Sequence, residues 1–171
     1  MPPLPAPPGP VLRHLTSLLT SGKSTFTPSR LTHLIPKPPK PNAAGTTASP
    51  GQFGNLFVTG KHKPDVMDQD LSEGEVGKKC LVAQNGANFR VTDIAPRTKG
   101  HMHATNSLDF LIVHKGQVTL QLDSGEKQLV KEGEVIVQRG TNHAWENETD
   151  EWVRMYVVLL EADRPTCLPT H

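Results

Sequence analysis

The chain has 171 residues, of which 35% are hydrophobic and 20% are charged, a balance typical of one soluble globular domain. The formal net charge is +1, but residues 1–64 contain seven Lys or Arg and no acid, whereas residues 65–171 carry a net charge of −6. Because phosphate contacts need a basic surface, no nucleic-acid partner is expected for this acidic part. No apolar run approaches the roughly 20 residues that cross a bilayer, so no membrane partner is expected either.

Residues 1–50 are predicted to form an extended N-terminal arm, because they hold twelve of the sixteen prolines. Proline lacks the amide hydrogen that a helix needs, so an import helix could begin only after Pro10 and would be short. We therefore expect a cytoplasmic protein, and we interpret Cys80 and Cys167 as free thiols. Residues 51–163 are predicted to form the folded domain, and residues 164–171 a tail.

Beyond the arm, the sequence predicts short strands separated by turns. In chain order, the strand candidates are 56–59, 80–84, 89–94, 108–113, 117–123, 127–130, 135–138 and 152–160. Apolar and polar residues alternate in the fifth candidate, which indicates one buried face. The last candidate is almost continuously apolar, which predicts burial on both faces. This pattern, with hardly any helical period, predicts an all-β barrel or sandwich.

Two histidine-containing segments give the most specific signal. The first begins Gly-His-Met-His at Gly100 and closes at Gly116, and the second reads Gln-Arg-Gly-Thr-Asn-His-Ala-Trp-Glu-Asn from Gln138 to Asn147. Together they resemble the two signature motifs of the cupin superfamily, and their surroundings resemble stand-alone fungal cupins found with natural-product pathways. The resemblance implies a single double-stranded β-helix barrel, the cupin jelly roll. It also implies a homodimer, and the proline-rich arm is expected either to be partly disordered or to pack on the neighbouring subunit.

The register of the first motif leaves one family histidine missing. Asp109 and Gly116 fit the acidic residue and the glycine of the family pattern, which places His103 at the first histidine position and Thr105 at the second. The other register pairs His101 with His103, but it lengthens the spacing to Asp109 beyond the usual one. We adopt the first register.

The second motif matches the family at Gly140, His143 and Asn147, while Gln138 stands where the family usually carries proline. Around the two motifs we predict six substrate-binding residues: Arg90, Met102, Thr105, Phe110, Gln138 and Trp145. Arg90 would hold a substrate carboxylate if it faces inward and would form a surface salt bridge if it faces outward. Strand alternation alone leaves both possibilities open.

The resemblance implies that His103, His143 and Asp109 are the catalytic residues. Two imidazoles and a carboxylate are a ligand set for iron, zinc or manganese, so the same three residues are the predicted metal ligands. Because the second histidine is missing, acid–base catalysis by the imidazoles without a metal is the alternative.

We expect an enzyme of the lyase or isomerase type that acts on a small carboxylic, ketone or polyketide-like substrate. Decarboxylation, dehydration and isomerisation all fit such a site. Two other functions stay open. One is an iron-dependent oxidoreductase that uses the same three residues, and the other is a cupin that binds a small molecule without catalysis.

Overall fold

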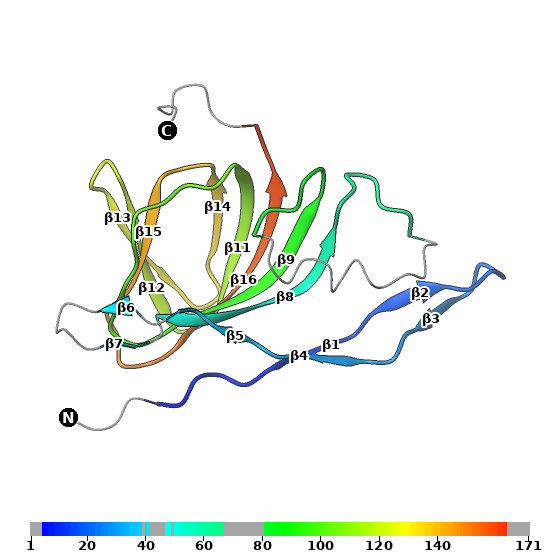
Figure 1. The fold of residues 1–171 in the computed structure, drawn as a ribbon, viewed down its shortest axis with the longest axis horizontal. Helices are drawn as coiled ribbons and strands as arrows, with labels where there is room; N and C mark the ends of the chain where they lie inside the picture. Colours follow the sequence, from blue (N-terminus) through cyan, green and yellow to red (C-terminus); the bar gives the residue numbers. More distant parts are fainter. Residues whose placement is uncertain (1–4, 39, 42–46, 49, 67–80, 164–171) are drawn as a thin grey trace.

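The computed structural model describes residues 5–38, 40–41, 47–48, 50–66 and 81–163, in which the chain forms strands and turns (Figure 1). Among these residues, no helix is long and apolar enough to cross a membrane. The strands are β1 (Val11–Arg13), β2 (Thr16–Leu18), β3 (Ser24–Phe26), β4 (Arg30–Thr32), β5 (Ile35–Pro36), β6 (Lys40–Pro41), β7 (Thr47–Ala48), β8 (Gly51–Thr59), β9 (Ala87–Ile94), β10 (Thr98–Lys99), β11 (Ser107–Lys115), β12 (Gln117–Leu122), β13 (Lys127–Lys131), β14 (Val135–Arg139), β15 (His143–Asn147) and β16 (Val153–Glu161).

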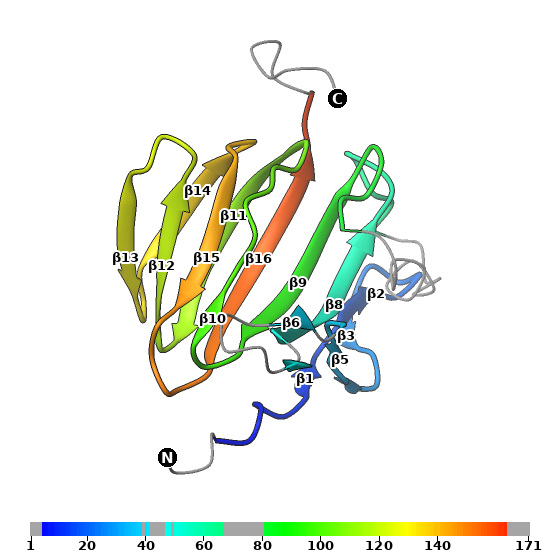
Figure 2. The ribbon, with the colours of Figure 1, turned by 60° about the vertical axis from the view of Figure 1, so that its left-hand side comes forward.

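Two antiparallel sheets form the barrel (Figure 2). The larger sheet has the order β14-β11-β16-β9-β8-β5, and the smaller one has the order β10-β15-β12-β13. Apolar side chains from both sheets meet between them in one cluster, which comprises Ile94, Leu111, Val113, Val118, Val130, Val153, Met155, Val157 and Leu159. The predicted all-β barrel is confirmed.

Two strand predictions differ from the structure. Residues 81–84 form a bend and a turn instead of a strand, and Cys80 lies outside the described residues, as does Cys167. The turn closes with a 3.1 Å hydrogen bond from the Gly86 amide to the Ala83 carbonyl, and Asn85 has a φ of 55°. Left-handed backbone of this kind ends a strand.

The last strand is buried on one face only, which corrects the second prediction. Along β16, buried residues alternate with half-buried ones from Val153 to Leu159. Its outward positions include Arg154, Tyr156 and Val158, which lie on the outer face of the sheet. A run of apolar residues was therefore not enough to predict a strand covered on both sides.

The N-terminal segment lies along the outside of the barrel. β1 pairs with β4 and β2 with β3, and Figure 1 shows this ribbon running beneath the barrel and projecting beyond it. β5 pairs with β8 and so belongs to the larger sheet. Three barrel side chains donate hydrogen bonds to main-chain carbonyls of the arm: Trp152 to Pro5 (2.8 Å), Gln52 to Pro8 (2.7 Å) and Arg154 to Gly9 (2.8 Å).

Asp93 organises this anchor from beneath the arm. Its side chain is fully buried and accepts two hydrogen bonds from Arg154, at 2.7 and 2.8 Å. The same carboxylate accepts a third bond, of 2.8 Å, from Gln52. Arg154 and Gln52 also donate hydrogen bonds to the arm. The buried Asp93 carboxylate therefore positions two of the three barrel side chains that anchor the arm.

Candidate active site

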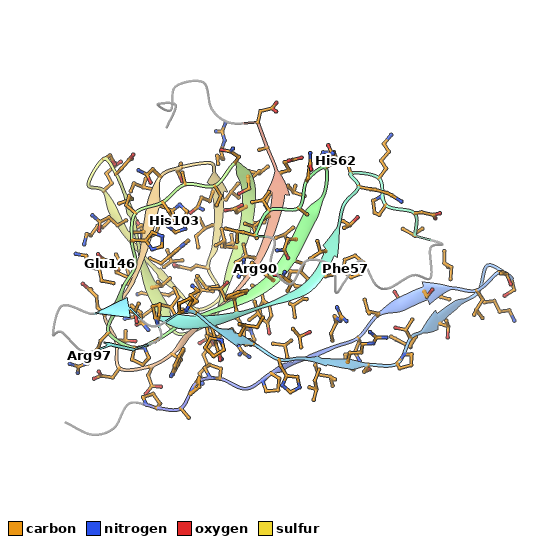
Figure 3. The ribbon with its side chains drawn as sticks, in the orientation of Figure 1. Phe57, His62, Arg90, Arg97, His103 and Glu146 are labelled. Atoms are coloured by element: carbon orange, nitrogen blue, oxygen red, sulfur yellow. The ribbon has the colours of Figure 1, made fainter. Side chains whose placement is uncertain are left out.

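The two histidine motifs meet inside the barrel. His143 begins β15, and His103 lies in the segment between β10 and β11. The backbone amide of each residue donates a hydrogen bond to the carbonyl of the other, at 2.9 and 2.8 Å, and their ring centroids are 4.4 Å apart. Figure 3 shows His103 beside β15. The backbone bridge therefore fixes the two imidazoles against each other.

Backbone carbonyls set the tautomer of both rings. His103 Nδ1 lies 3.0 Å from the His101 carbonyl oxygen, and His143 Nδ1 lies 2.9 Å from the Thr141 carbonyl oxygen. A carbonyl oxygen can only accept a hydrogen bond, so each Nδ1 carries the hydrogen. Nε2 is therefore the atom through which each ring can accept a proton or a hydrogen bond.

Gln138 joins the predicted carboxylate to the second imidazole. Its amide nitrogen lies 2.9 Å from Asp109 Oδ2 and 3.2 Å from His143 Nε2, and all three side chains are buried. A side-chain amide has two hydrogens, so one nitrogen can donate to both neighbours. Gln138 is opposite Asp109 in the β11–β14 register, which explains why it reaches the carboxylate.

Burial controls the charge of this group. It lowers the pKa of His143 to about 4, against the opposing hydrogen bond to Thr141, and the nearby His103 and His101 lower it further. His143 is therefore neutral at physiological pH. Burial also raises the pKa of Asp109, while Ser107, Gln138 and His103 favour its anion. Among the residues that the structure describes, none forms a well-aligned hydrogen bond with Asp109 Oδ1.

The three predicted metal ligands do not form a ligand set in this arrangement. No group of three His, Cys, Asp or Glu side chains within the described ranges is placed to hold a metal ion. The Gln138 amide lies between Asp109 and His143, and it occupies the Nε2 lone pair through which His143 would bind a metal. These three side chains therefore do not fit a metal centre in this arrangement.

The other predicted site residues lie in different places. Trp145 packs edge-on against the His143 ring, with centroids 5.6 Å apart, and Arg90 lies on the inner face of the larger sheet. The Thr105 hydroxyl is bonded to Ser107 at 2.8 Å, and Met102 is exposed. Phe110 is not brought to the site, because strand alternation puts it on the outer face next to the inward Asp109.

His101 and Gly100 have positioning roles that the preferred register did not indicate. The His101 ring lies 4.9 Å from the His103 ring, and its carbonyl fixes the His103 tautomer. The Gly100 amide donates to the Trp145 carbonyl, and a Cβ atom at Gly100 would lie only 2.6 Å from that oxygen. Both residues lie within the first histidine segment, so the sequence indicated their location but not their roles.

A hollow of about 270 Å³ lies away from the histidines, between β1 and the outer face of the larger sheet. Its lining includes Leu12, Leu56, Phe57 and Tyr156, and Figure 3 shows Phe57 on β8. This hollow is separated from the barrel interior by the sheet, so it does not belong to the imidazole site.

Residues 90–159 match the family model described as a cupin domain. These residues are a cupin domain. The predicted resemblance is confirmed, and the solved structure of the cupin domain of Schizosaccharomyces pombe Cnp3 has a similar fold, with a TM-score of 0.50 and 12% identity over 88% of this chain and 87% of that one.

Curated relatives of this chain come from fungi. One is "Cupin-domain-containing oxidoreductase virC" of Hypocrea virens, 38% identical over 114 residues, which are 64% of this chain and 59% of the relative. Another is "Phomopsin biosynthesis cluster protein C'" of Diaporthe leptostromiformis, 46% identical over 78 residues, which are 45% of this chain and 41% of the relative. The chain thus spans about half the length of these relatives.

The pKa of His143 makes a prediction for stability. An unperturbed histidine has a pKa near 6.5, whereas burial in the folded chain lowers the pKa of His143 to about 4. Between these values only the unfolded chain takes up the proton, so stability present above pH 6.5 should be lost as the pH falls toward 4, by up to about 3 kcal/mol. Urea unfolding at a series of pH values measures this loss, and His143→Gln should reduce it.

Asp109 contributes with the opposite sign, because its pKa is raised in the folded state. Its stabilising contribution is present at low pH and is lost as the pH rises through the folded value. Both proteins retain Asp109, so the difference between the two pH profiles reports on His143. Identical profiles would contradict the assigned neutral, buried imidazole.

Proposed function

We propose that this cupin is an enzyme that transfers a proton on a small organic metabolite, as a lyase or isomerase. The observation that carries the proposal is the pair of imidazoles with backbone-fixed tautomers. His103 Nε2 has no hydrogen-bond partner among the described residues, while His143 is held neutral by burial. Dehydration and isomerisation of a carbonyl compound need a group that takes up and returns a proton, and decarboxylation needs a group that protonates the resulting carbanion.

In this proposal His103 takes the proton from the substrate through Nε2 and returns it later. A neutral His143 does not repel the positive charge that His103 then acquires, and the nearby Asp109 carboxylate attracts it. Gln138 and Asp109 act on His143 by holding its ring in place. The fungal biosynthesis-cluster relative supports a small metabolite as the substrate class.

The proposal is tested with a panel of small carboxylic acids, ketones and phenols incubated with the full chain in D2O. Proton transfer should incorporate deuterium into product or recovered substrate, which mass spectrometry detects. His103→Ala should lower this incorporation at least about 100-fold. His114→Ala is the matched control, since His114 is exposed and packs against Tyr156 on the outer face. Full incorporation by the His103 variant would refute the assigned base.

An oxidoreductase is the second candidate, and the names of relatives such as the Hypocrea virens protein favour it. Oxygen consumption linked to product formation, measured on the same panel with and without added iron, distinguishes it from proton transfer. Oxygen uptake that requires His143 would favour the oxidoreductase. Saturable binding of a panel member without turnover would favour a non-catalytic binding cupin.

We also propose that the protein forms a homodimer in the cytoplasm. On the outer face of the larger sheet, Phe110 is opposite Val137, and Ile112 is opposite Val135. These four side chains are 44–70% exposed and adjoin one another, and contiguous exposed apolar surface of this kind is typical of an interface.

Sedimentation should therefore give twice the chain mass of 18.7 kDa. Val137→Lys should shift the species toward that of a monomer, because a charge would be buried in the interface. Leu129→Lys is the matched control, since Leu129 has similar exposure but lies on the smaller sheet. A wild-type monomer would exclude the dimer.

A further inference from the structure

Arg90 is a buried cation on the inner face of the barrel. Its side chain is only 7% exposed, and it stands opposite Val157, a member of the hydrophobic core cluster. The guanidinium lies over the Phe53 ring, 4.6 Å from the ring centroid. Arg90 therefore faces the interior, where a cation without a counter-ion is unfavourable.

No acidic side chain of the described residues compensates this charge. Within the described part of the chain Arg90 forms no ion pair, and its buried Nε atom has no hydrogen-bond partner. Burial lowers the pKa of Arg90 to about 10, and no neighbouring carboxylate raises it. The residue is therefore still protonated at physiological pH, and its donors remain available for an anion. By contrast, Arg154 on the same sheet has Asp93 as its partner.

The surroundings favour a flat, partly apolar anion. The Phe53 ring covers one face of the guanidinium, and Asn55 lies opposite Arg90 on β8. A guanidinium presents its N–H groups in one plane, which suits two parallel bonds to a carboxylate. The aromatic and aliphatic neighbours suit an unsaturated or aromatic carbon skeleton better than a hydrated inorganic ion.

We propose that Arg90 binds a carboxylate group of the substrate inside the barrel. The identity of the reaction rests on the proposed function, whereas the binding of a carboxylate by Arg90 does not. Arg90 is on the larger sheet, whereas His143 is on the smaller one, and Figure 3 shows Arg90 and His103 on different sides of the barrel. A carboxylic acid held by Arg90 would extend between the sheets and present its remaining part to the imidazoles.

Benzoate is a suitable probe, with benzamide as its neutral analogue and phosphate as a simple anion. Isothermal titration and thermal unfolding of the full chain should show saturable binding of benzoate and at least tenfold weaker binding of benzamide and of phosphate. Arg90→Met should weaken benzoate binding at least tenfold. Arg97→Met is the control, because Arg97 is exposed and paired with Asp150.

The unliganded Arg90→Met protein should be at least as stable as wild type, since an apolar side chain of similar length replaces an unpaired buried charge. Equal binding of benzoate to both proteins, equal binding of phosphate and benzoate, or unfolding of the methionine variant would overturn the assignment. His143→Ala should keep the benzoate response. Failure of benzoate binding therefore refutes the Arg90 site alone, whereas intact binding without any proton transfer refutes the proposed reaction alone.

Discussion

Replacing His143 by alanine is expected to lower turnover about 100-fold while the barrel stays folded, because loss of the ring packed against His103 lets the base leave its productive position. The substitution removes the neutral ring that lies 4.4 Å from His103. It also leaves one hydrogen of the Gln138 amide without its acceptor, which should cost about 1–3 kcal/mol of stability. Product formation on the substrate panel and circular dichroism measure the two effects separately.

His62→Ala provides the control for this substitution. His62 is exposed, and Figure 3 shows it on the far side of the barrel from His103. It should retain wild-type turnover and stability. A His143→Ala protein with undiminished turnover would show that His143 has no part in the reaction, whatever its tautomer.

Replacing Asp93 by alanine is expected to cause the largest loss of stability, about 3–5 kcal/mol. Arg154 would lose a partner that now accepts two hydrogen bonds, although its own side chain is only 12% exposed. Because Arg154 and Gln52 also hold the arm, residues 5–9 should become accessible to protease. Urea unfolding and limited proteolysis measure these two consequences.

A double variant separates the stability contributed by the Asp93–Arg154 ion pair from the anchoring of the arm. Asp93→Ala combined with Arg154→Met should recover much of the lost stability, since no charge is then left unpaired beneath the arm. It should not restore protection of residues 5–9, because the Arg154 bond to Gly9 is still missing. A loss below about 1 kcal/mol in the single variant would contradict the role given to Asp93.

The sequence predicted the strands well where one face of the strand is buried and the other is exposed to solvent. In β12 the alternation predicted the strand, and Val118 is buried in the core cluster while Leu120 packs against it half-buried. The strand prediction failed at residues 81–84, where a turn forms. The positive φ of Asn85 in this turn is not apparent from the composition. The prediction that the final strand is buried on both faces was wrong, because apolar residues also occur on the outer face of a sheet and are of the same types as core residues.

For the site, the motif spacing predicted that His103 and His143 belong together, and the backbone bridge brings them together. It did not predict that Gln138 lies between Asp109 and His143, because that contact depends on the β11–β14 register. Arg90 could not be placed inward or outward, since either face of β9 carries a charged residue. Pairing with Val157 decides this question.

Residues 5–9 of the arm bind to the barrel through main-chain carbonyl oxygens, which every amino acid carries, whereas Arg13 further along the arm donates a side-chain hydrogen bond to the Leu56 carbonyl. None of the three anchoring bonds at Pro5, Pro8 and Gly9 involves an arm side chain. Evolution can therefore change the identity of these residues freely, provided that the chain remains extended. A homologue could keep the same docked arm with no recognisable sequence similarity there. Searches for the arm should look instead for the barrel residues that hold it: a buried Asp–Arg pair with a nearby Gln and Trp.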